Sequence, residues 1–425
     1  MLTTLALLLT THTAWADGPI YVDRDAPGPT HDGASWATAY VTLQGALDVA
    51  TSGDEVWVAA GVYTPTAGID RAATFALLNG VGLYGGFVGV ESVRDARDPH
   101  VHVTVLSGDL DGNDTTTPDG VVTDTTRITG TNAYHAVTAQ SVIETAILDG
   151  FTITAGKADG DSQQSYNMGG GMYNVGASPT VRNVIFGGNQ ANHGGGMYNS
   201  WYSSPTLIDV TFSGNYGAGG TGGGMSNYYS SPTLLNATFS GNQASAGGGM
   251  HNSWYSSPAL VHVTFSGNQA STGGGMYNYA GSNPILDNCI LWGNTAGSGA
   301  QMYNSGSSLP VINYSLVQGG CPGDASCDAH LLTIDPLFVD ADGADHVVGT
   351  PDDDLRLRDN SPAIDAGDNG AVPADTYDLD GDGDVAEPLP YDLAGSRRFA
   401  SHPQPDTGAG TAPLVDMGAY ERPGL

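Results

Sequence analysis

The residues best placed to do chemistry form a run of alternating aspartates near the end of the 425-residue sequence. Asp378, Asp380, Asp382 and Asp384 stand at every second position, and glycine follows the second and third of them. Calcium takes about six to eight oxygen ligands, and a tight acidic loop supplies carboxylates at short intervals. An EF-hand loop also has an acid at its twelfth position, which is Leu389 here. The run predicts a calcium site, with a solvated acidic turn as the alternative.

A second acidic loop, at residues 107–127, offers another set of calcium ligands. These are Asp109, Asp111 and Asn113. In an enzymatic interpretation, the two aspartates would hold calcium against an acidic sugar, and Arg127 would abstract a proton from that sugar. A calcium-dependent polysaccharide lyase is therefore the alternative function.

Aromatic side chains recur in the middle of the chain and suit binding better than catalysis. The rings in question are Tyr198, Trp201, Tyr202, Tyr228, Tyr229, Trp254, Tyr255 and Tyr277. Large exposed apolar patches usually mark interaction sites, and rings flanked by Asn and Ser suit stacking on sugars. Alternatively, the rings pack on neighbouring corners or beneath the C-terminal part of the chain. The sequence leaves both interpretations open.

A repeated unit must position these rings. The phrase GGGMYN or a variant of it occurs six times between residues 169 and 304, and its methionines are 25, 28, 25, 26 and 26 residues apart. A second phrase alternates with it, as in SPTLIDVTFSGN, SPTLLNATFSGN and SPALVHVTFSGN. Self-similarity at this period is the signature of a stacked array, in which each unit packs on its neighbours.

The composition of the unit predicts short strands. It is rich in Gly, Ser, Thr and Asn, which disfavours helices. Val210 and Phe212 are separated by a strand-like step of two, whereas the step of three from Leu207 implies a bend. We therefore predict an all-β fold, a parallel β-helix whose like residues stack about 4.8 Å apart. The recurring asparagines are assigned to the scaffold, and Leu43–Ala50 to a short helix that closes one end.

Charge is nearly absent from the array. Residues 165–320 contain no Lys or Glu, and only Arg182, Asp209 and Asp287 are charged. Sugar hydrolysis needs two carboxylates about 5–10 Å apart, but these two aspartates fall three coils apart in different columns. The array therefore lacks acid–base machinery. Three histidines are expected to be polar turn or surface residues: His193, His251 and His262.

The overall charge restricts partner and compartment. The net charge is −32 with only 12 Lys plus Arg, which disfavours nucleic acid. Residues 1–16 resemble a secretory signal peptide, and no later segment is apolar enough to span a bilayer. Cys321 and Cys327 are expected to form a disulfide, and Cys289 a buried thiol. We expect a monomer that is secreted or held at the cell surface.

Three stretches resemble known families. The opening, with DGASWATAYVTLQGALDVA and GDEVWVAAG, is similar to that of exported bacterial right-handed parallel β-helix proteins of the pectate-lyase-like group. The GGGMYN…FSGN block resembles the repeats of polymorphic outer-membrane proteins. DPLFVD, LRLRDNSPAIDAGDN, DLAGSRR and VDMGAYE, in this order, resemble the C-terminal choice-of-anchor Q module. Pectate lyases, as this resemblance implies, need calcium-ligating carboxylates and an Arg or Lys base on the coil surface.

These observations predict four segments. They are a signal peptide at 1–16, an N-terminal cap with irregular coils at 17–164, the regular array at 165–320 and the acidic module at 321–425. The favoured function is non-catalytic binding of a polysaccharide or cell-surface glycan through the aromatic turns, with calcium-stabilised loops. Pectate-type lyase activity is the alternative.

Overall fold

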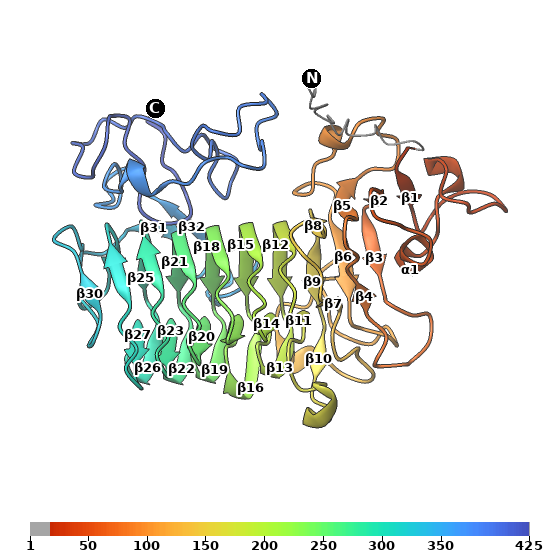
Figure 1. Ribbon diagram of the computed structural model, residues 1–425, viewed down its shortest axis with the longest axis horizontal. Coiled ribbons are helices and arrows are strands. Elements are labelled where there is room, and N and C mark those ends of the chain that lie inside the picture. Colours follow the sequence, from red (N-terminus) through yellow and green to blue (C-terminus); the bar gives the residue numbers. More distant parts are fainter. Residues whose placement is uncertain (1–17, 425) are drawn as a thin grey trace, which may run out of the picture.

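The computed structural model describes residues 18–424, and it is a parallel β-helix, as predicted (Figure 1). The predicted signal peptide lies outside the described residues. Three parallel sheets run along the helix, and each coil contributes strands to them. No helix in the described part is long and apolar enough to cross a membrane.

The first sheet is the longest and carries the N-terminal coils. Its main path consists of β1 (Ile20–Val22), β2 (Glu55–Ala59), β5 (Gly82–Phe87), β8 (Ile147–Asp149), β12 (Thr180–Gly187), β15 (Thr206–Ser213), β18 (Thr233–Ser240), β21 (Ala259–Ser266), β24 (Ile285–Asp287), β28 (Val311–Asn313) and β30 (Ser326–Cys327). Further strands of the same sheet pair beside this path: β3 (Gly61–Tyr63), β6 (Thr104–Ser107), β9 (Thr152–Thr154), β25 (Ile290–Trp292) and β29 (Leu316–Val317). The ladder thus continues beyond residue 320.

Two further sheets complete the coils. The second contains β4 (Phe75–Ala76), β7 (Val137–Gln140), β11 (Met172–Val175), β14 (Met197–Ser200), β17 (Met225–Tyr228), β20 (Met250–Ser253), β23 (Met276–Tyr279) and β27 (Met302–Asn304). The third contains β10 (Lys157–Ala158), β13 (Gln190–His193), β16 (Tyr216–Thr221), β19 (Gln243–Ala246), β22 (Gln269–Thr272) and β26 (Thr295–Ser298). Outside the β-helix, β31 (Phe338–Asp340) and β32 (Asp354–Leu357) pair antiparallel.

Helices are few and short among the described residues. α1 (Leu43–Leu47) confirms the predicted helix at one end, and its three buried side chains join the main core. The 3-10 turns are Trp36–Thr38, Arg94–Ala96, Thr125–Arg127, Ser162–Gln164 and Asn369–Ala371. The Cys321–Cys327 disulfide and the buried Cys289 thiol are present as predicted.

Like residues stack in register from coil to coil. Met197 pairs with Met225, and Phe212 with Phe239. The phenylalanine rings stack face to face, with centroids 4.6 Å apart for Phe212 and Phe239. Methionine and phenylalanine are fully buried on these coils, so they fill the interior. The predicted bend is confirmed, because Asp209 has a left-handed φ of 56° between Leu207 and Val210.

Two asparagine ladders run through the interior. In one of them, Asn215 donates to Asn242 at 2.9 Å, and Asn242 donates to Asn268 at 2.9 Å. The Asn242 amide also donates to the Phe212 carbonyl at 2.9 Å. These amides are fully buried, so their hydrogen bonds satisfy polar groups that water cannot reach. The scaffold role predicted for the asparagines is consistent with this arrangement.

The C-terminal module packs on the outer side of the first sheet, where it lies alongside β21 and β18 (Figure 1). The module contacts the residues at the left-handed bends of the first-sheet strands in the array, which stack from coil to coil in a column. Asn236 donates to the Tyr391 carbonyl at 2.9 Å, and Asn288 accepts from the Asp368 amide at 2.7 Å. The fully buried Arg398 donates to Asn236 at 2.7 Å. The module therefore covers the first sheet.

Replacing Asn242 tests the ladder. Asn242→Ala removes the acceptor of both Asn215 donors and a donor to Phe212, and leaving buried groups unpaired costs about 1–3 kcal/mol each. We expect the free energy of unfolding to fall by about 3 kcal/mol in urea denaturation. Exposed Gln243→Ala is the matched control and should change it by about 0.5 kcal/mol or less. Equal stability of the two variants would contradict a structural role for the ladder.

Candidate functional site

An aromatic ladder stands on the turns that follow the second sheet. It consists of Trp201, Tyr229 and Trp254, one ring per coil, flanked by Tyr202 and Tyr255. The Trp201 and Tyr229 ring centroids lie 6.1 Å apart with planes inclined by 13°, and those of Tyr229 and Trp254 lie 5.9 Å apart with planes inclined by 29°. The coil register produces this stack, because the Tyr202 amide donates to the Tyr229 carbonyl across the coils.

The ladder faces solvent. Trp201 is 57% exposed, Tyr202 77%, Trp254 42% and Tyr255 69%, whereas Tyr229 between them is half-buried. Each aromatic pair occupies left-handed backbone, for example with φ of 53° at Trp201 and 66° at Tyr202, which turns the side chains away from the core. Of the alternative interpretation, packing under the module is wrong, because these rings are exposed and the module covers the first sheet. Packing on neighbouring corners is confirmed, since the rings stack on one another from turn to turn while they remain exposed.

Other predicted ring positions differ. Tyr198 is only 7% exposed, so its ring does not belong to a solvent-facing strip. Tyr228 and Tyr277 are half-buried; Tyr228 packs edge-on against Tyr229, with centroids 4.8 Å apart. The ladder spans three coils, because Gly176 precedes Trp201 and Ala280 follows Trp254 in the stack.

The polar neighbours expected beside the rings are buried instead. Asn199, Asn227 and Asn252 are fully buried in the second asparagine ladder, and Ser203 and Ser256 bond within the coils. They are unavailable to a ligand. The tyrosine hydroxyls and the indole N–H groups of Trp201 and Trp254 are the polar groups that the ladder rings themselves present.

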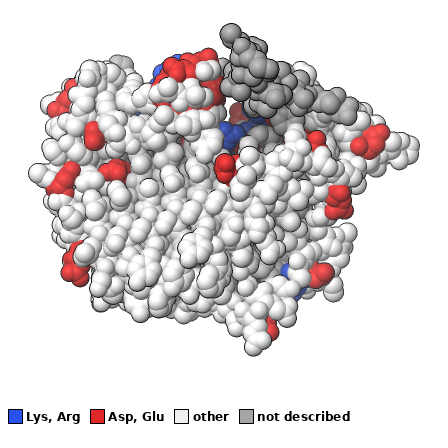
Figure 2. All heavy atoms as spheres, viewed as in Figure 1, with Lys and Arg blue, Asp and Glu red and all other residues white. Residues whose placement is uncertain are grey.

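The surroundings of the ladder carry almost no charge. The charged side chains of the array lie on the first sheet: Arg182 pairs with Asp149 at 3.0 Å, and Asp209 and Asp287 hydrogen-bond to Asn236 and Asn313. Figure 2 shows the central strands as an uncharged expanse, with acidic groups towards its margins. An acidic or basic ligand would find no partner on this surface.

The C-terminal acidic run is only partly brought together. Carboxylate oxygens of Asp378, Asp380 and Asp382 lie within 4.8 Å of one another. Asp384 is outside this group, and its carboxylate accepts from the Ala386 amide at 3.0 Å. A second group that sequence reasoning missed joins Asp380 to Asp375 and Glu387.

The predicted calcium ligands of the acidic loop at 107–127 are engaged in hydrogen bonds within the same part of the chain. Asp109 accepts from the amides of Gly112, Asn113 and Asp114, Asp111 accepts from Thr131, and Asn113 accepts from Thr129. These oxygens therefore hold the loop, and the described acids here do not form a metal-binding group. Arg127 is 57% exposed and lies 3.5 Å from Asp124. Nothing in this geometry prepares it as a base.

The three histidines were expected to be polar turn or surface residues, and this is wrong for His251, which is buried in β20. His262 does occupy a left-handed bend, with φ of 55°, but its side chain is buried there. His251 is 7% exposed and His262 1%. Burial lowers the pKa of His251 to about 3, and burial with the nearby Arg398 guanidinium lowers the pKa of His262 well below its usual value. His262 lies under the module, in the column that docks it. Both side chains are neutral and structural.

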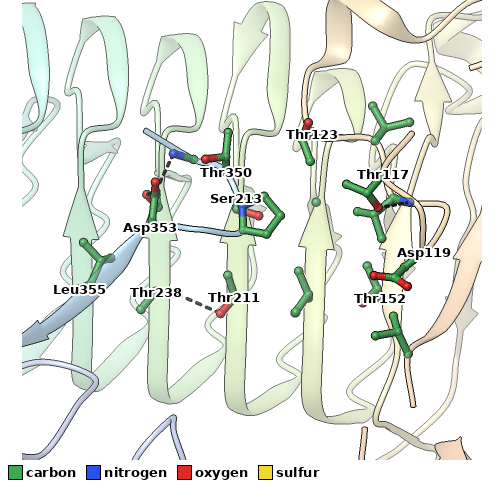
Figure 3. A pocket seen from close by; sticks show the side chains of 18 of the residues that line it. Thr117, Asp119, Thr123, Thr152, Thr211, Ser213, Thr238, Thr350, Asp353 and Leu355 are labelled. Carbon is green, nitrogen blue, oxygen red and sulfur yellow. Dashed lines mark hydrogen bonds between the residues drawn. The ribbon is translucent and has the colours of Figure 1, made fainter. Parts of the chain in front are cut away.

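A groove between the module and the first sheet was missed by sequence reasoning. One hollow of about 310 Å³ and a second of about 350 Å³ share Thr152, Ile185, Thr211 and Tyr420 in their linings, so the two hollows are adjacent. Figure 3 shows Thr211 and Thr238 on the floor, with Asp119 and Asp353 on opposite sides. We call this hollow the module groove. Its walls come from the loop at 107–127, the first sheet and the module, which are far apart in the sequence, so no single sequence motif marks it.

The groove contains carboxyls with raised pKa. Burial raises the pKa of Asp353 to about 6 although it accepts from Ser240 at 2.7 Å, and burial raises the pKa of Asp209 to about 7. Among the described residues that line the groove, none is Arg or Lys. It therefore offers proton donors but lacks the base that the lyase interpretation requires, and Arg127 does not line it.

Comparison with known proteins identifies the fold. No protein-family model matches the chain, and no curated protein matches its sequence. The crystal structure of pectate lyase Pel9A is similar, with a TM-score of 0.51 and 12% sequence identity over 96% of this chain and 98% of that chain. Pectin methylesterase PemA from Erwinia chrysanthemi aligns with a TM-score of 0.38 and 10% identity over 73% of this chain and 93% of that chain. The similarity to Pel9A shows a shared parallel β-helix fold.

The pKa of Asp209 gives a test of the groove. The pKa is raised to about 7 from 3.8 in the folded chain, so ionisation favours unfolding as pH rises from about 4 to about 7. Asp209→Asn keeps an oxygen that accepts from Asn236 without the charge. Its gain in Tm over wild type should be small at pH 4, grow to pH 7 and then stay constant. Exposed Asp324→Asn is the control, and a pH-independent gain for Asp209→Asn would refute the buried carboxyl.

Proposed function

We propose that the protein is an exported β-helix that binds a neutral polysaccharide through the aromatic ladder without transforming it. The exposure of Trp201 and Trp254, stacked on either side of Tyr229, is the observation that carries the proposal. Soluble proteins rarely leave large rings uncovered unless they meet a partner. Trp and Tyr give a large, rigid contact area at low cost in conformational entropy.

A sugar polymer fits this surface better than a compact partner. The coil spacing repeats ring positions along a line, so that an extended chain can meet several rings in succession. Tyrosine hydroxyls supply hydrogen bonds to sugar hydroxyls, while the rings contact the apolar faces of the sugar. Neutral polymers are favoured because the surface lacks charge and the net charge of −32 repels polyanions.

The family resemblances extend this proposal to location. The similarity of the C-terminal segments to the choice-of-anchor Q module and of the repeats to polymorphic outer-membrane proteins supports a role at or outside the cell surface. The Cys321–Cys327 disulfide is compatible with an oxidising compartment. Free secretion and surface attachment both agree with glycan binding.

A glycan array with wild type and paired variants tests the proposal. The probes are neutral glucans, mannans, xylans and galactans, with polygalacturonate as the acidic comparison. We expect wild type to bind at least one neutral polymer, and Trp201→Ala with Trp254→Ala to weaken binding about tenfold or more, since tenfold corresponds to about 1.4 kcal/mol. Tyr216→Ala removes a 37% exposed ring on the third sheet and is the matched control.

Two results would overturn the proposal. One is wild-type binding to none of the neutral probes. The other is binding that survives loss of both tryptophans but not of Tyr216. Circular dichroism and melting of each variant establish that a loss of binding is not a loss of folding.

The lyase alternative has its own measurement. Absorbance of unsaturated uronate is followed with polygalacturonate and added calcium. We expect no product from wild type, because the module groove lacks an Arg or Lys base among its described lining residues. Product that disappears in Arg127→Ala would establish the lyase and contradict non-catalytic binding.

A further inference from the structure

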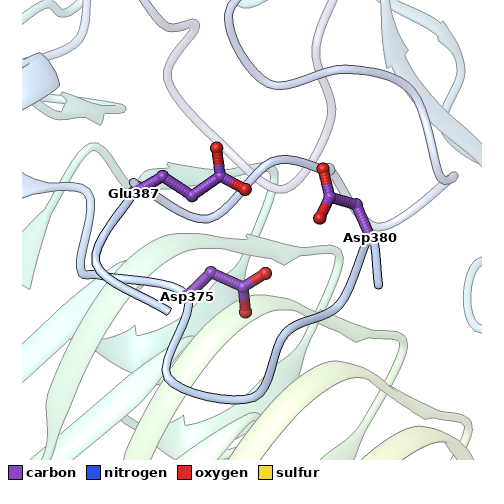
Figure 4. Close-up of side chains that lie close together, drawn as sticks. All are labelled: Asp375, Asp380 and Glu387. Carbon is purple, nitrogen blue, oxygen red and sulfur yellow. The ribbon is translucent and has the colours of Figure 1, made fainter. Parts of the chain in front are cut away.

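A closed loop in the C-terminal module brings distant acids together. Residues 375–387 form a loop whose two ends are joined, because the Asp375 amide donates to the Glu387 carbonyl at 2.7 Å. We call these paired ends the neck of the loop. The Leu389 amide donates to the Pro373 carbonyl at 2.9 Å and extends this neck. Asp375 and Glu387 at the neck are both acids, and the Asp380 carboxylate in the loop lies close to theirs. Figure 4 shows the three carboxylates directed into the same space.

The acids meet at bonding distance for a common cation. Oxygens of Asp375, Asp380 and Glu387 lie within 4.8 Å of one another. Asp375 is fully buried, and its Oδ1 has no hydrogen-bond partner. Its other oxygen accepts from the Leu379 amide at 2.6 Å, which fixes the direction of Oδ1. Glu387 also has a buried oxygen, Oε1, without a partner.

Such an arrangement needs a positive charge. Burying an unpaired carboxylate is costly, and like charges at this distance repel. The loop contains six acids and no Lys, Arg or His. Arg397 lines the neighbouring hollow with Asp380 and Glu387, yet it forms no ion pair with either among the described contacts. The chain itself therefore leaves these charges uncompensated.

We propose that Asp375, Asp380 and Glu387 form a calcium site. The ligand set consists of carboxylate oxygens, which suit calcium, whereas zinc sites use His and Cys. Asp378 and Asp382, which approach Asp380, add negative charge beside it. This site differs from the run predicted from sequence, because Asp375 and Glu387 come from the neck and Asp384 takes no part.

The site would fasten the module to the β-helix. Tyr377 and Leu379 lie in the closed loop and join a hydrophobic cluster with Ile208 and Leu235 of the array. A cation that bridges the neck to Asp380 would hold these two side chains in place. Calcium would thus act on docking of the module onto the first sheet, and the inference does not depend on glycan binding.

Protons should compete with calcium. Calcium affinity is therefore expected to fall as pH falls, since only the ionised carboxylates bind the cation.

Calorimetry with the full chain, after removal of metal by chelator, tests the site. We expect wild type to bind one calcium ion, with Kd of roughly 10–1000 µM. Asp375→Asn and Glu387→Gln should each weaken binding at least about tenfold, a change of about 1.4 kcal/mol. Asp384→Asn, in the same loop but outside the group, is the matched control and should bind as wild type does.

Thermal melting separates a calcium site from a purely structural carboxylate. Without calcium, Asp375→Asn should melt at or above the wild-type Tm, because it removes a buried unpaired charge. With calcium, the order should reverse, since only wild type gains stability from the bound ion. A second variant, Asp380→Asn, changes a half-buried ligand and repeats the test without altering the buried Asp375.

Three results would overturn the proposal. The first is that wild type binds no calcium up to roughly 10 mM, well beyond the affinity of extracellular sites. The second is an equal loss of calcium affinity in Asp384→Asn and Asp375→Asn, and the third is a Tm of Asp375→Asn below that of wild type with no calcium present. Loss of calcium binding in Asp382→Asn, together with normal calcium binding in Asp375→Asn, would place the site at the tip of the loop and would also refute the proposal.

Discussion

The in-register stacking of one coil on the next is the constraint on which the rest of the structure depends. A buried asparagine must find another asparagine above and below it, as Asn242 does with Asn215 and Asn268. A coil shifted by one residue would bury polar groups without partners and turn Phe239 outward. The same register that satisfies the interior also aligns the outer residues. The aromatic ladder is thus a by-product of the coil register that became available for binding.

The two outer surfaces of the array are used differently. On the first sheet, the bend residues Asn236, His262 and Asn288 are polar and meet the C-terminal module, whose buried Arg398 reaches into this column. On the second sheet, the turns carry Trp and Tyr and meet solvent. The charged side chains of the array lie on the first sheet, so the turns that carry Trp and Tyr are left without charge. The loop at 375–387 packs against the first sheet through Tyr377 and Leu379, so the proposed cation would act on docking of the module and not on the aromatic ladder.

Much of the fold was readable from the sequence because the repeat is explicit. Met197, Asn199 and Phe212 recur at one spacing, and local alternation identified their strands. The sequence is less informative where coils are irregular: the stretch Ile147–Ile153 is divided into β8 and β9 at Gly150, whose φ is 85°. Side-chain period alone does not reveal such a break.

The candidate sites were less predictable, for a physical reason. Exposure of Trp201 and burial of His262 depend on which sheet the module covers, and no local pattern encodes that choice. Asp375 and Glu387 come together because the neck pairs residues twelve apart, whereas the alternating run drew attention to Asp384. Asp375 lies only three residues before the run, but its place in the proposed calcium site follows from its burial, which the sequence does not indicate. The groove between Thr211 and Asp353 likewise exists only after docking.

A crystal structure of the protein with an oligosaccharide from the neutral polymer it binds most tightly would test the central claim most directly. The account predicts sugar rings lying against Trp201, Tyr229 and Trp254, with tyrosine hydroxyls bonded to sugar hydroxyls. Sugar found instead in the module groove, between Thr211 and Asp353, would contradict it and would return attention to chemistry at the raised-pKa carboxyls.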